Sequence, residues 1–270
     1  MSRSEAGDEG KSMRLRNRSA LVTGAGSGIG RAIARRLAAE GAFVACAGRA
    51  KERCEETVAL VEQDGGRGAA FACDVTDQES VRSFVEAVVR GQGAIHIVVN
   101  NAGAGGANSL SGEDDSRWHA IVDTNLTGLY HVTKAALPRM PDNSGGRFVN
   151  VSSVLGRFGV PGYTAYCASK HGVIGFTKAL AHEVARRGIT ANSICPGWVE
   201  TEMAVRGMRL GADATGTTYE EFRRRALDAV PIGRILEPEE IAGLAAYLCS
   251  DEASGVTGQA IGINGGSTMD

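Results

Sequence analysis

The chain has 270 residues, of which 43% are hydrophobic and 22% charged, and its formal net charge of −2 argues against a nucleic-acid partner. Its six cysteines form no CxxC pair, which disfavours a disulfide framework and a zinc site and fits a reducing cytoplasm. No apolar run approaches the ~20 residues that a membrane span needs, so no membrane partner is expected.

After a flexible tail over residues 1–14, short β-rich runs alternate with amphipathic helical patterns. Apolar strands that alternate with helices indicate a parallel sheet covered on both faces, and right-handed crossovers make it doubly wound and Rossmann-like. No boundary divides residues 15–270, so one α/β domain is predicted. We expect strands at 19–23, 43–47, 68–75, 94–100, 147–152, 190–195 and 259–264, and helices at 30–40, 51–63, 116–140, 164–187 and 237–250, with one more from a capping box of Thr76 and Glu79 to about Arg90.

The turn after the first expected strand reads TGAGSGIG, from Thr23 to Gly30, and opens a helix. It does not contain the GxGxxG fingerprint in any register. Its glycines nevertheless permit positive φ and a close approach of the backbone to a pyrophosphate at a helix N-terminus. A mobile glycine-rich loop is the alternative. The expected nucleotide contacts here are Gly24, Ser27, Gly28, Ile29 and Gly30.

The end of the second expected strand indicates which dinucleotide binds. An acidic residue there would hold the ribose 2′-hydroxyl of NAD, whereas an arginine accommodates the 2′-phosphate of NADP. This chain has no acid at Gly48 and carries a cation at Arg49. NADP(H) is therefore the preferred cofactor and NAD(H) the alternative, while a merely solvated Arg49 would leave the choice open.

The stretch YCASK places Tyr166 and Lys170 four residues apart, so their side chains can meet on one face of a helix. A free tyrosine has a pKa near ~10, and a fixed positive charge beside it lowers that pKa. By itself the pair is either a tuned acid/base or a chance occurrence of Tyr-x-x-x-Lys.

Taken together, these motifs resemble the short-chain dehydrogenase/reductase family over about residues 15–267. The matching features are TGAGSGIG, NNAG at 100–103, Ser153 thirteen residues before Tyr166, Lys170, Asn125 in DTNLTG, and PGWVET at 196–201. The resemblance implies that Tyr166 is the general acid in reduction and that Ser153 polarises the carbonyl. It also implies that Lys170 lowers the pKa of Tyr166 and holds the nicotinamide ribose. Asn125 would hold a water for proton resupply, or else only satisfy backbone groups.

The same resemblance implies further cofactor contacts at the strand ends. Asp74 and Val75 should face the adenine, although an aspartate before a helix is commonly only a cap. No metal site is expected, because His182-Glu183 lacks the second histidine of HExxH at position 186. The remaining expected contacts are Asn101, Ala102 and Gly103 along the adenosine ribose, and Pro196, Gly197, Val199 and Thr201 along the nicotinamide.

Within the family, SKHGVIGFTKAL, CPGWVET and VPIGR look most like bacterial polyketide ketoreductases and 3-oxoacyl-carrier-protein reductases. This implies NADPH-dependent reduction of a β-ketoacyl or polyketide substrate, free or on an acyl carrier protein. One departure is Ala104-Gly105-Gly106, where some of those enzymes have Pro-Gly-Gly. The alternatives are a hydroxyacyl or secondary-alcohol dehydrogenase that oxidises with NAD, and a non-catalytic dinucleotide-binding regulator.

The section 201–230 is predicted to be a substrate lid. It leaves the sheet after PGWVET and mixes glycines with apolar side chains, and a capping box of Thr218 and Glu221 predicts a helix from about Tyr219. A rigid packed helix is the alternative. The resemblance also implies a cytoplasmic homotetramer, with the helices at 116–140 and 164–187 pairing across two-fold axes.

Overall fold

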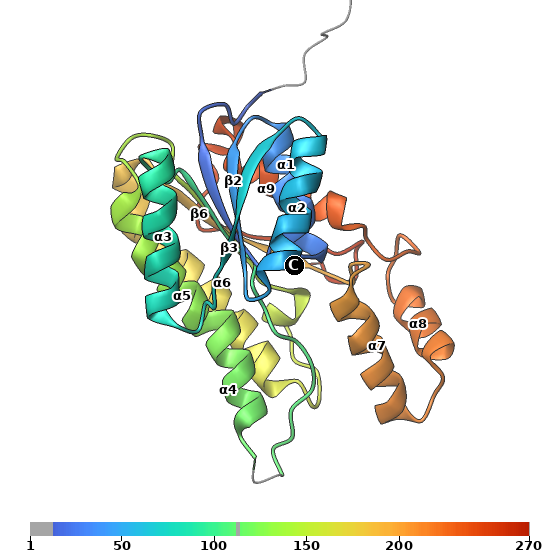
Figure 1. Ribbon diagram of the computed structural model, residues 1–270. Coiled ribbons are helices and arrows are strands. Elements are labelled where there is room, and N and C mark those ends of the chain that lie inside the picture. The colour runs from blue at the N-terminus through green and yellow to red at the C-terminus, as the bar shows by residue number, and fades with distance from the viewer. Residues whose placement is uncertain (1–12, 112–113, 270) are drawn as a thin grey trace, which may run out of the picture.

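Figure 1 shows the computed structural model, which describes residues 13–111 and 114–269. In these ranges the strands form one seven-stranded parallel sheet in the order β3-β2-β1-β4-β5-β6-β7. The order reverses between β1 and β4, where the carboxyl ends of parallel strands leave room for a ligand. The predicted doubly wound α/β fold is confirmed. The strands are β1 (Ser19–Thr23), β2 (Phe43–Gly48), β3 (Arg67–Ala72), β4 (Ile97–Asn100), β5 (Arg147–Val151), β6 (Thr190–Pro196) and β7 (Ala260–Ile263).

Helices cover both faces of the sheet. One face packs against α1 and α9, and the other against α3, α5 and α6, so the described residues form a hydrophobic core on each face. Strand β1 contributes side chains to both cores, because Ala20 and Val22 point into the first core and Leu21 points into the second. None of the described helices is both long and apolar enough to cross a membrane. The helices are α1 (Gly28–Ala39), α2 (Lys51–Gln63), α3 (Gln78–Gln92), α4 (Ser116–Val122), α5 (Gly128–Ala136), α6 (Thr164–Val184), α7 (Glu202–Thr215), α8 (Tyr219–Asp228) and α9 (Pro238–Cys249).

Two local predictions are wrong. The capping box of Thr76 and Glu79 does not form: Asp77 is the N-cap of α3, and its side chain accepts from the backbone N–H of Glu79. The cause is Asp74, whose carboxylate accepts hydrogen bonds from the Thr76 amide at 2.9 Å and hydroxyl at 2.8 Å. The Thr76 side chain is thereby held in the turn, and the helix begins after it. Strands β3 and β4 are also shorter than the predicted 68–75 and 94–100.

The helix predicted over 116–140 is present but not uniform. Between α4 and α5 the turn Asp123–Thr127 is π-helical, and a 3-10 turn, Leu137–Arg139, follows α5. A π turn inserts one extra residue into the helix and often marks a functional site. This turn carries Asn125.

The section 201–230 forms two helices that lie side by side away from the sheet (Figure 1). Helix α8 begins at the predicted capping box of Thr218 and Glu221. Helix α7 is an addition to the prediction: Gly207 and Gly211 lie inside it, and Gly216 ends it in a left-handed conformation.

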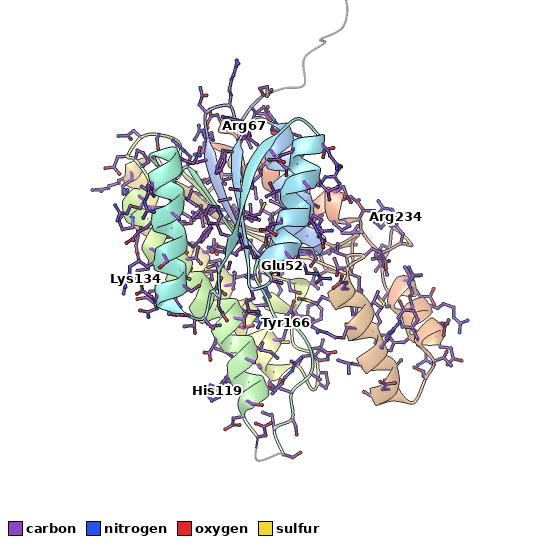
Figure 2. The ribbon with its side chains drawn as sticks, in the orientation of Figure 1. Glu52, Arg67, His119, Lys134, Tyr166 and Arg234 are labelled. Carbon is purple, nitrogen blue, oxygen red and sulfur yellow. The ribbon has the colours of Figure 1, made fainter. Side chains whose placement is uncertain are left out.

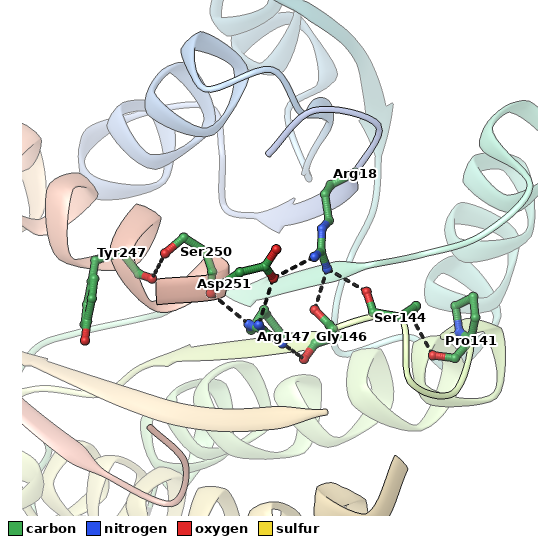
Figure 3. A network of polar contacts seen from close by, with 9 residues as sticks. Arg18, Pro141, Ser144, Gly146, Arg147, Tyr247, Ser250 and Asp251 are labelled. Carbon is green, nitrogen blue, oxygen red and sulfur yellow. Dashed lines mark hydrogen bonds and ion pairs between the residues drawn. The ribbon is translucent and has the colours of Figure 1, made fainter. Parts of the chain in front are cut away.

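A buried polar network joins three distant parts of the chain at the opposite, amino edge of the sheet (Figure 3). The Arg147 side chain at the start of β5 is 2% exposed and donates to the Ser250 carbonyl at 3.2 Å. Arg147 and Arg18 both donate to the same carboxylate oxygen of Asp251, at 3.2 Å and 2.8 Å respectively. Arg18 also donates to the Ser144 carbonyl at 2.8 Å. Of residues 1–14, the predicted tail, positions 1–12 lie outside the described residues; Arg14 pairs with Glu40 at 2.7 Å.

Candidate active site

The glycine-rich turn between β1 and α1 is shaped by steric necessity. Gly24 and Gly28 have φ of +64° and +51°, in the left-handed region that favours glycine. A β-carbon added to Gly30 would overlap the carbonyl oxygen of Gly24, and one added to Gly24 would lie 2.9 Å from the Cα of Ala102. Ser27 is the N-cap of α1 but makes no capping bond with its side chain. The turn therefore offers backbone N–H groups to an anion at the N-terminus of α1.

The NNAG turn after β4 is hydrogen-bonded to this glycine-rich turn. The backbone amides of Asn101 and Ala102 both donate to the hydroxyl of Thr23 at 3.1 Å. The Asn101 side chain donates to the Thr23 carbonyl at 2.9 Å and the Gly24 carbonyl at 3.2 Å. Gly103 follows at the centre of the site: a β-carbon there would lie 3.8 Å from the amine of Lys170. The two predicted cofactor segments thus form one surface.

The PGWVET segment borders that surface. Pro196 ends β6, Gly197 follows it, and Val199 is buried. Thr201 is the N-cap of α7, and its methyl carbon would lie 3.1 Å from a β-carbon added to Gly28. The structure therefore brings Thr201, one of the predicted nicotinamide-side residues, against the predicted pyrophosphate turn.

Arg49 and Asp74 lie at the ends of β2 and β3. Arg49 is exposed, and its positive charge is one of the groups that act on Asp74. Burial favours a higher pKa for Asp74, but hydrogen bonds from Thr76 and the charge of Arg49 outweigh it, so the pKa is lowered. The Asp74 side chain is thus engaged in the turn by Thr76 and does not cap α3, whose N-cap is Asp77; its contact with the adenine stays a prediction. Val75 next to it is buried.

Three predicted catalytic side chains meet at the carboxyl edge of the sheet, where Figure 2 labels Tyr166. Tyr166 and Lys170 lie one turn apart on α6, and the amine of Lys170 is 5.7 Å from the centre of the tyrosine ring. That amine donates to the Val151 carbonyl at 2.8 Å. Ser153, just beyond β5, is hydrogen-bonded to Tyr166. The predicted spacing thus corresponds to contact in space.

Burial governs the electrostatics of the pair. Burial raises the pKa of Tyr166, and the hydrogen bond to Ser153 offsets only part of this effect. Desolvation of the phenolate is the largest effect on the pKa of Tyr166 in this structure, and the lowering of that pKa by Lys170 stays a prediction. Burial also lowers the pKa of Lys170, from 10.5 to about 8.

The side chain of Asn125 is 2% exposed and fully engaged as a donor. Its amide nitrogen donates to the Ala104 carbonyl at 2.9 Å and to the Ser169 hydroxyl at 3.0 Å, and its oxygen accepts from the Ala104 amide at 2.7 Å. Asn125 thus joins the segment after the NNAG turn to helix α6. A relay water would have to use the remaining lone pair of its oxygen or its main-chain carbonyl.

Two contributors were missed by sequence reasoning although both stand inside the quoted motifs. Thr23 bridges the two cofactor turns, and Ser169, between Tyr166 and Lys170, receives the bond from Asn125. The signal that could have indicated them is a hydroxyl side chain at the end of a strand, as in Thr23, or inside a catalytic motif, as in Ser169. Among the described residues, no group of three or more His, Cys, Asp or Glu side chains could hold a metal ion.

The comparisons with known proteins agree with this geometry. A family model described as "Enoyl-(Acyl carrier protein) reductase" matches residues 24–268. A protein of Streptomyces virginiae assigned as a ketoacyl reductase of the monensin polyketide synthase is 44% identical over 93% of this chain and 97% of its own length. The 3-oxoacyl-acyl-carrier-protein reductase FabG of Haemophilus influenzae is 41% identical over 93% of this chain and 98% of its own length.

A solved structure shares the fold closely. The crystal structure of a single-substitution variant of the actinorhodin polyketide ketoreductase with NADPH superposes with a TM-score of 0.88 at 42% identity, covering 93% of this chain and 97% of that one. The sequence motifs, the sheet order and these relatives agree. The chain belongs to the short-chain dehydrogenase/reductase family.

Proposed function

We propose that the protein is an NADPH-dependent ketoreductase that reduces the carbonyl of a β-ketoacyl or polyketide substrate. The observation that carries this is the contact between Ser153 and Tyr166, with the Lys170 amine beside the same ring. The relatives named ketoacyl reductases, and the neighbour solved with NADPH, support the reaction and the cofactor.

The residues present fit a dinucleotide. The positive φ of Gly24 and Gly28 and the close packing at Gly30 shape a turn that a pyrophosphate could approach. The exposed Arg49, with no acid at Gly48, suits a 2′-phosphate. Bound NADPH would supply the hydride.

Tyr166 would donate its proton to the substrate oxygen as negative charge develops there, and Ser153 would donate a second hydrogen bond to that oxygen. Burial raises the pKa of Tyr166, so a positive charge close to the phenol is needed to favour release of its proton. Lys170 would offer its positive charge to the tyrosinate that remains and hold the nicotinamide ribose. Asn125 would support the water that resupplies the proton.

The acyl group is proposed to arrive free or on an acyl carrier protein. A hollow of about 550 Å³ lies along the start of α7, and its lining combines two arginines with two carboxylates: Glu200, Thr201, Glu202, Val205, Arg206 and Arg209. Each carboxylate is paired with an arginine outside the hollow, Glu200 with Arg223 and Glu202 with Arg53. Two guanidinium groups there suit the phosphate of a carrier arm or an acidic partner surface. The section 201–230, which carries most of this lining, would act as a lid over the bound substrate. We further propose a cytoplasmic homotetramer, which light scattering at micromolar concentration tests directly.

Tyr166→Phe is the direct test of the proposed function. It should leave the fold intact and lower kcat for ketone reduction by about 100-fold or more, because the proton donor is lost. Tyr130→Phe makes the same chemical change at an exposed position on α5 and should leave kcat unchanged. Retention of more than half the activity in Tyr166→Phe would contradict the assignment. Faster oxidation of hydroxyacyl substrates with NAD would favour the dehydrogenase alternative.

A further inference from the structure

Arg117, in the first turn of α4, reaches back to the segment 104–108 that follows the NNAG turn. Its guanidinium donates to the carbonyl of Gly105 and, at 3.4 Å, to the carbonyl of Ala107. Gly106 between them has a φ of +123°, and a β-carbon there would overlap the guanidinium of Arg117. The arginine therefore occupies the space that a side chain at position 106 would need.

Asn108 secures the other end of the same segment. Its backbone N–H donates to the Gly162 carbonyl at 2.8 Å, and its side-chain nitrogen donates to the Thr164 hydroxyl at 2.8 Å. Its side-chain oxygen accepts from the amide of Ala165 at 2.9 Å. The N-cap of α6, Tyr163, makes no capping bond with its own side chain. Asn108 thus caps the helix that carries Tyr166.

Gly105 forms the part of this segment nearest the predicted proton donor. It is buried, and a β-carbon added to it would lie 3.7 Å from the ring of Tyr166 and 3.2 Å from the sulfur of Met203 on α7. The backbone at Gly105 therefore fills the gap between Tyr166 and the lid helix. A displacement of this backbone would change the space available above the phenol.

We propose that Arg117 is a positioning residue for substrate selection, which rests on the proposed ketoreductase function. With Asn108 it fixes the segment 104–108 as the wall beside Tyr166, and the position of that wall sets the size of ketone that reaches the hydroxyl. A segment with two adjacent glycines has many accessible conformations without such contacts. Arg117 acts through the Gly105 backbone and does not touch the reacting atoms.

The test compares two substrates of different width, a short β-ketoacyl thioester and a fused bicyclic ketone, at saturating NADPH. Arg117→Leu should change the ratio of kcat/KM for the two substrates by about fivefold or more, through KM, because the wall can move. The KM for NADPH and the kcat for the short thioester should stay unchanged. Arg117→Lys, which can still donate to one carbonyl, should restore part of the ratio. His119→Leu, exposed on the same helix, is the matched control and should behave as wild type.

Hydrogen exchange gives a second reading that does not depend on turnover. Amides of residues 104–108 should exchange faster in Arg117→Leu than in wild type, while those of residues 24–30 should not change. An unchanged substrate ratio together with unchanged exchange overturns the inference; if Arg117→Leu fails to fold, the same criterion applies to Arg117→Lys. If the wild type reduces neither ketone, the proposed function fails, and exchange alone still decides whether Arg117 holds the segment.

Discussion

The two regions on either side of Tyr166 are held in opposite ways. The cofactor turns are joined by hydrogen bonds through Thr23 and Asn101 and by glycines that admit no side chain. The helices of the predicted lid form exposed ion pairs with the body, Arg53–Glu202 at 2.7 Å and Arg223–Glu200 at 3.2 Å. Such pairs contribute only about 0–1 kcal/mol and weaken with salt. The predicted cofactor turns are therefore fixed by hydrogen bonds and close packing, whereas the predicted lid combines buried apolar side chains, Met208 and Ala212, with ion pairs that are weak and exposed.

The largest expected effect falls on the fixed side. Lys170→Met should lower kcat by about 100-fold, because the charge beside Tyr166 is lost, and should also raise the KM for NADPH. Lys178→Met, on the solvent side of the same helix, is the control. If kcat falls and the KM for NADPH stays constant, Lys170 does not hold the ribose.

The same substitution should make the protein more stable at neutral pH. The pKa of Lys170 in the folded protein, about 8, lies below its ordinary value of 10.5, so the unfolded chain binds the proton more tightly. The free energy of unfolding of the wild type should therefore rise with pH between these values. Lys170→Met should be more stable by on the order of 2 kcal/mol at pH 7, and the difference should shrink at pH 9. Ketone reduction by the wild type should decline as the pH rises through 8.

A second change tests how tightly the glycine-rich turn is packed. In Gly30→Ala the new methyl group would overlap the Gly24 carbonyl, at a cost of about 1–3 kcal/mol. If this whole cost appears as a loss of binding free energy at the displaced turn, the affinity for NADPH should fall roughly 5- to 150-fold. Gly243→Ala in α9, where a β-carbon meets open space, should bind NADPH normally. Equal NADPH affinity in both variants, by titration, would mean that the turn is not fixed.

Arg49→Leu should alter the choice of cofactor more than catalysis. We expect kcat/KM with NADPH to fall about tenfold while the value with NADH is unchanged, because one charge-assisted bond to the 2′-phosphate is lost. Adding Gly48→Asp should raise kcat/KM with NADH. A side chain at this position must displace Cys54, whose sulfur would lie 3.1 Å from the new β-carbon. Arg90→Leu, an exposed arginine on α3, is the control. A wild type that already prefers NADH would refute the assignment.

The smallest effect is expected on the lid side. Glu202→Gln removes the ion pair with Arg53 and should change the KM for ketone by less than about threefold. It should speed hydrogen exchange in 202–215, and added salt should have the same effect on the wild type. Glu220→Gln on α8 is the control. Strong protection of 202–215 in every variant, unaltered by ligand, would mean that α7 is a rigid wall.

The sequence predicted the sheet and the Ser153–Tyr166–Lys170 group because strand periodicity and motif spacing are local signals. It did not predict α7, since Gly207 and Gly211 are weak helix formers. In the structure a β-carbon on Gly211 would overlap the Phe222 ring, so that glycine allows close packing of α7 on α8. The π turn at Asn125 was equally hidden, because it places the asparagine against Ala104, a contact between segments.

The arginine pair at the amino edge of the sheet bears on synthesis of the chain. Asp251, the partner shared by Arg18 and Arg147, follows strands β1 to β6 in the chain. Until it emerges from the ribosome, Arg147 would be a buried cation without its carboxylate, which is strongly unfavourable. We expect the central strands of the nascent chain to stay open until Asp251 has been synthesised. Early termination before residue 251 should therefore give an aggregation-prone product that chaperones retain, instead of a partly active enzyme.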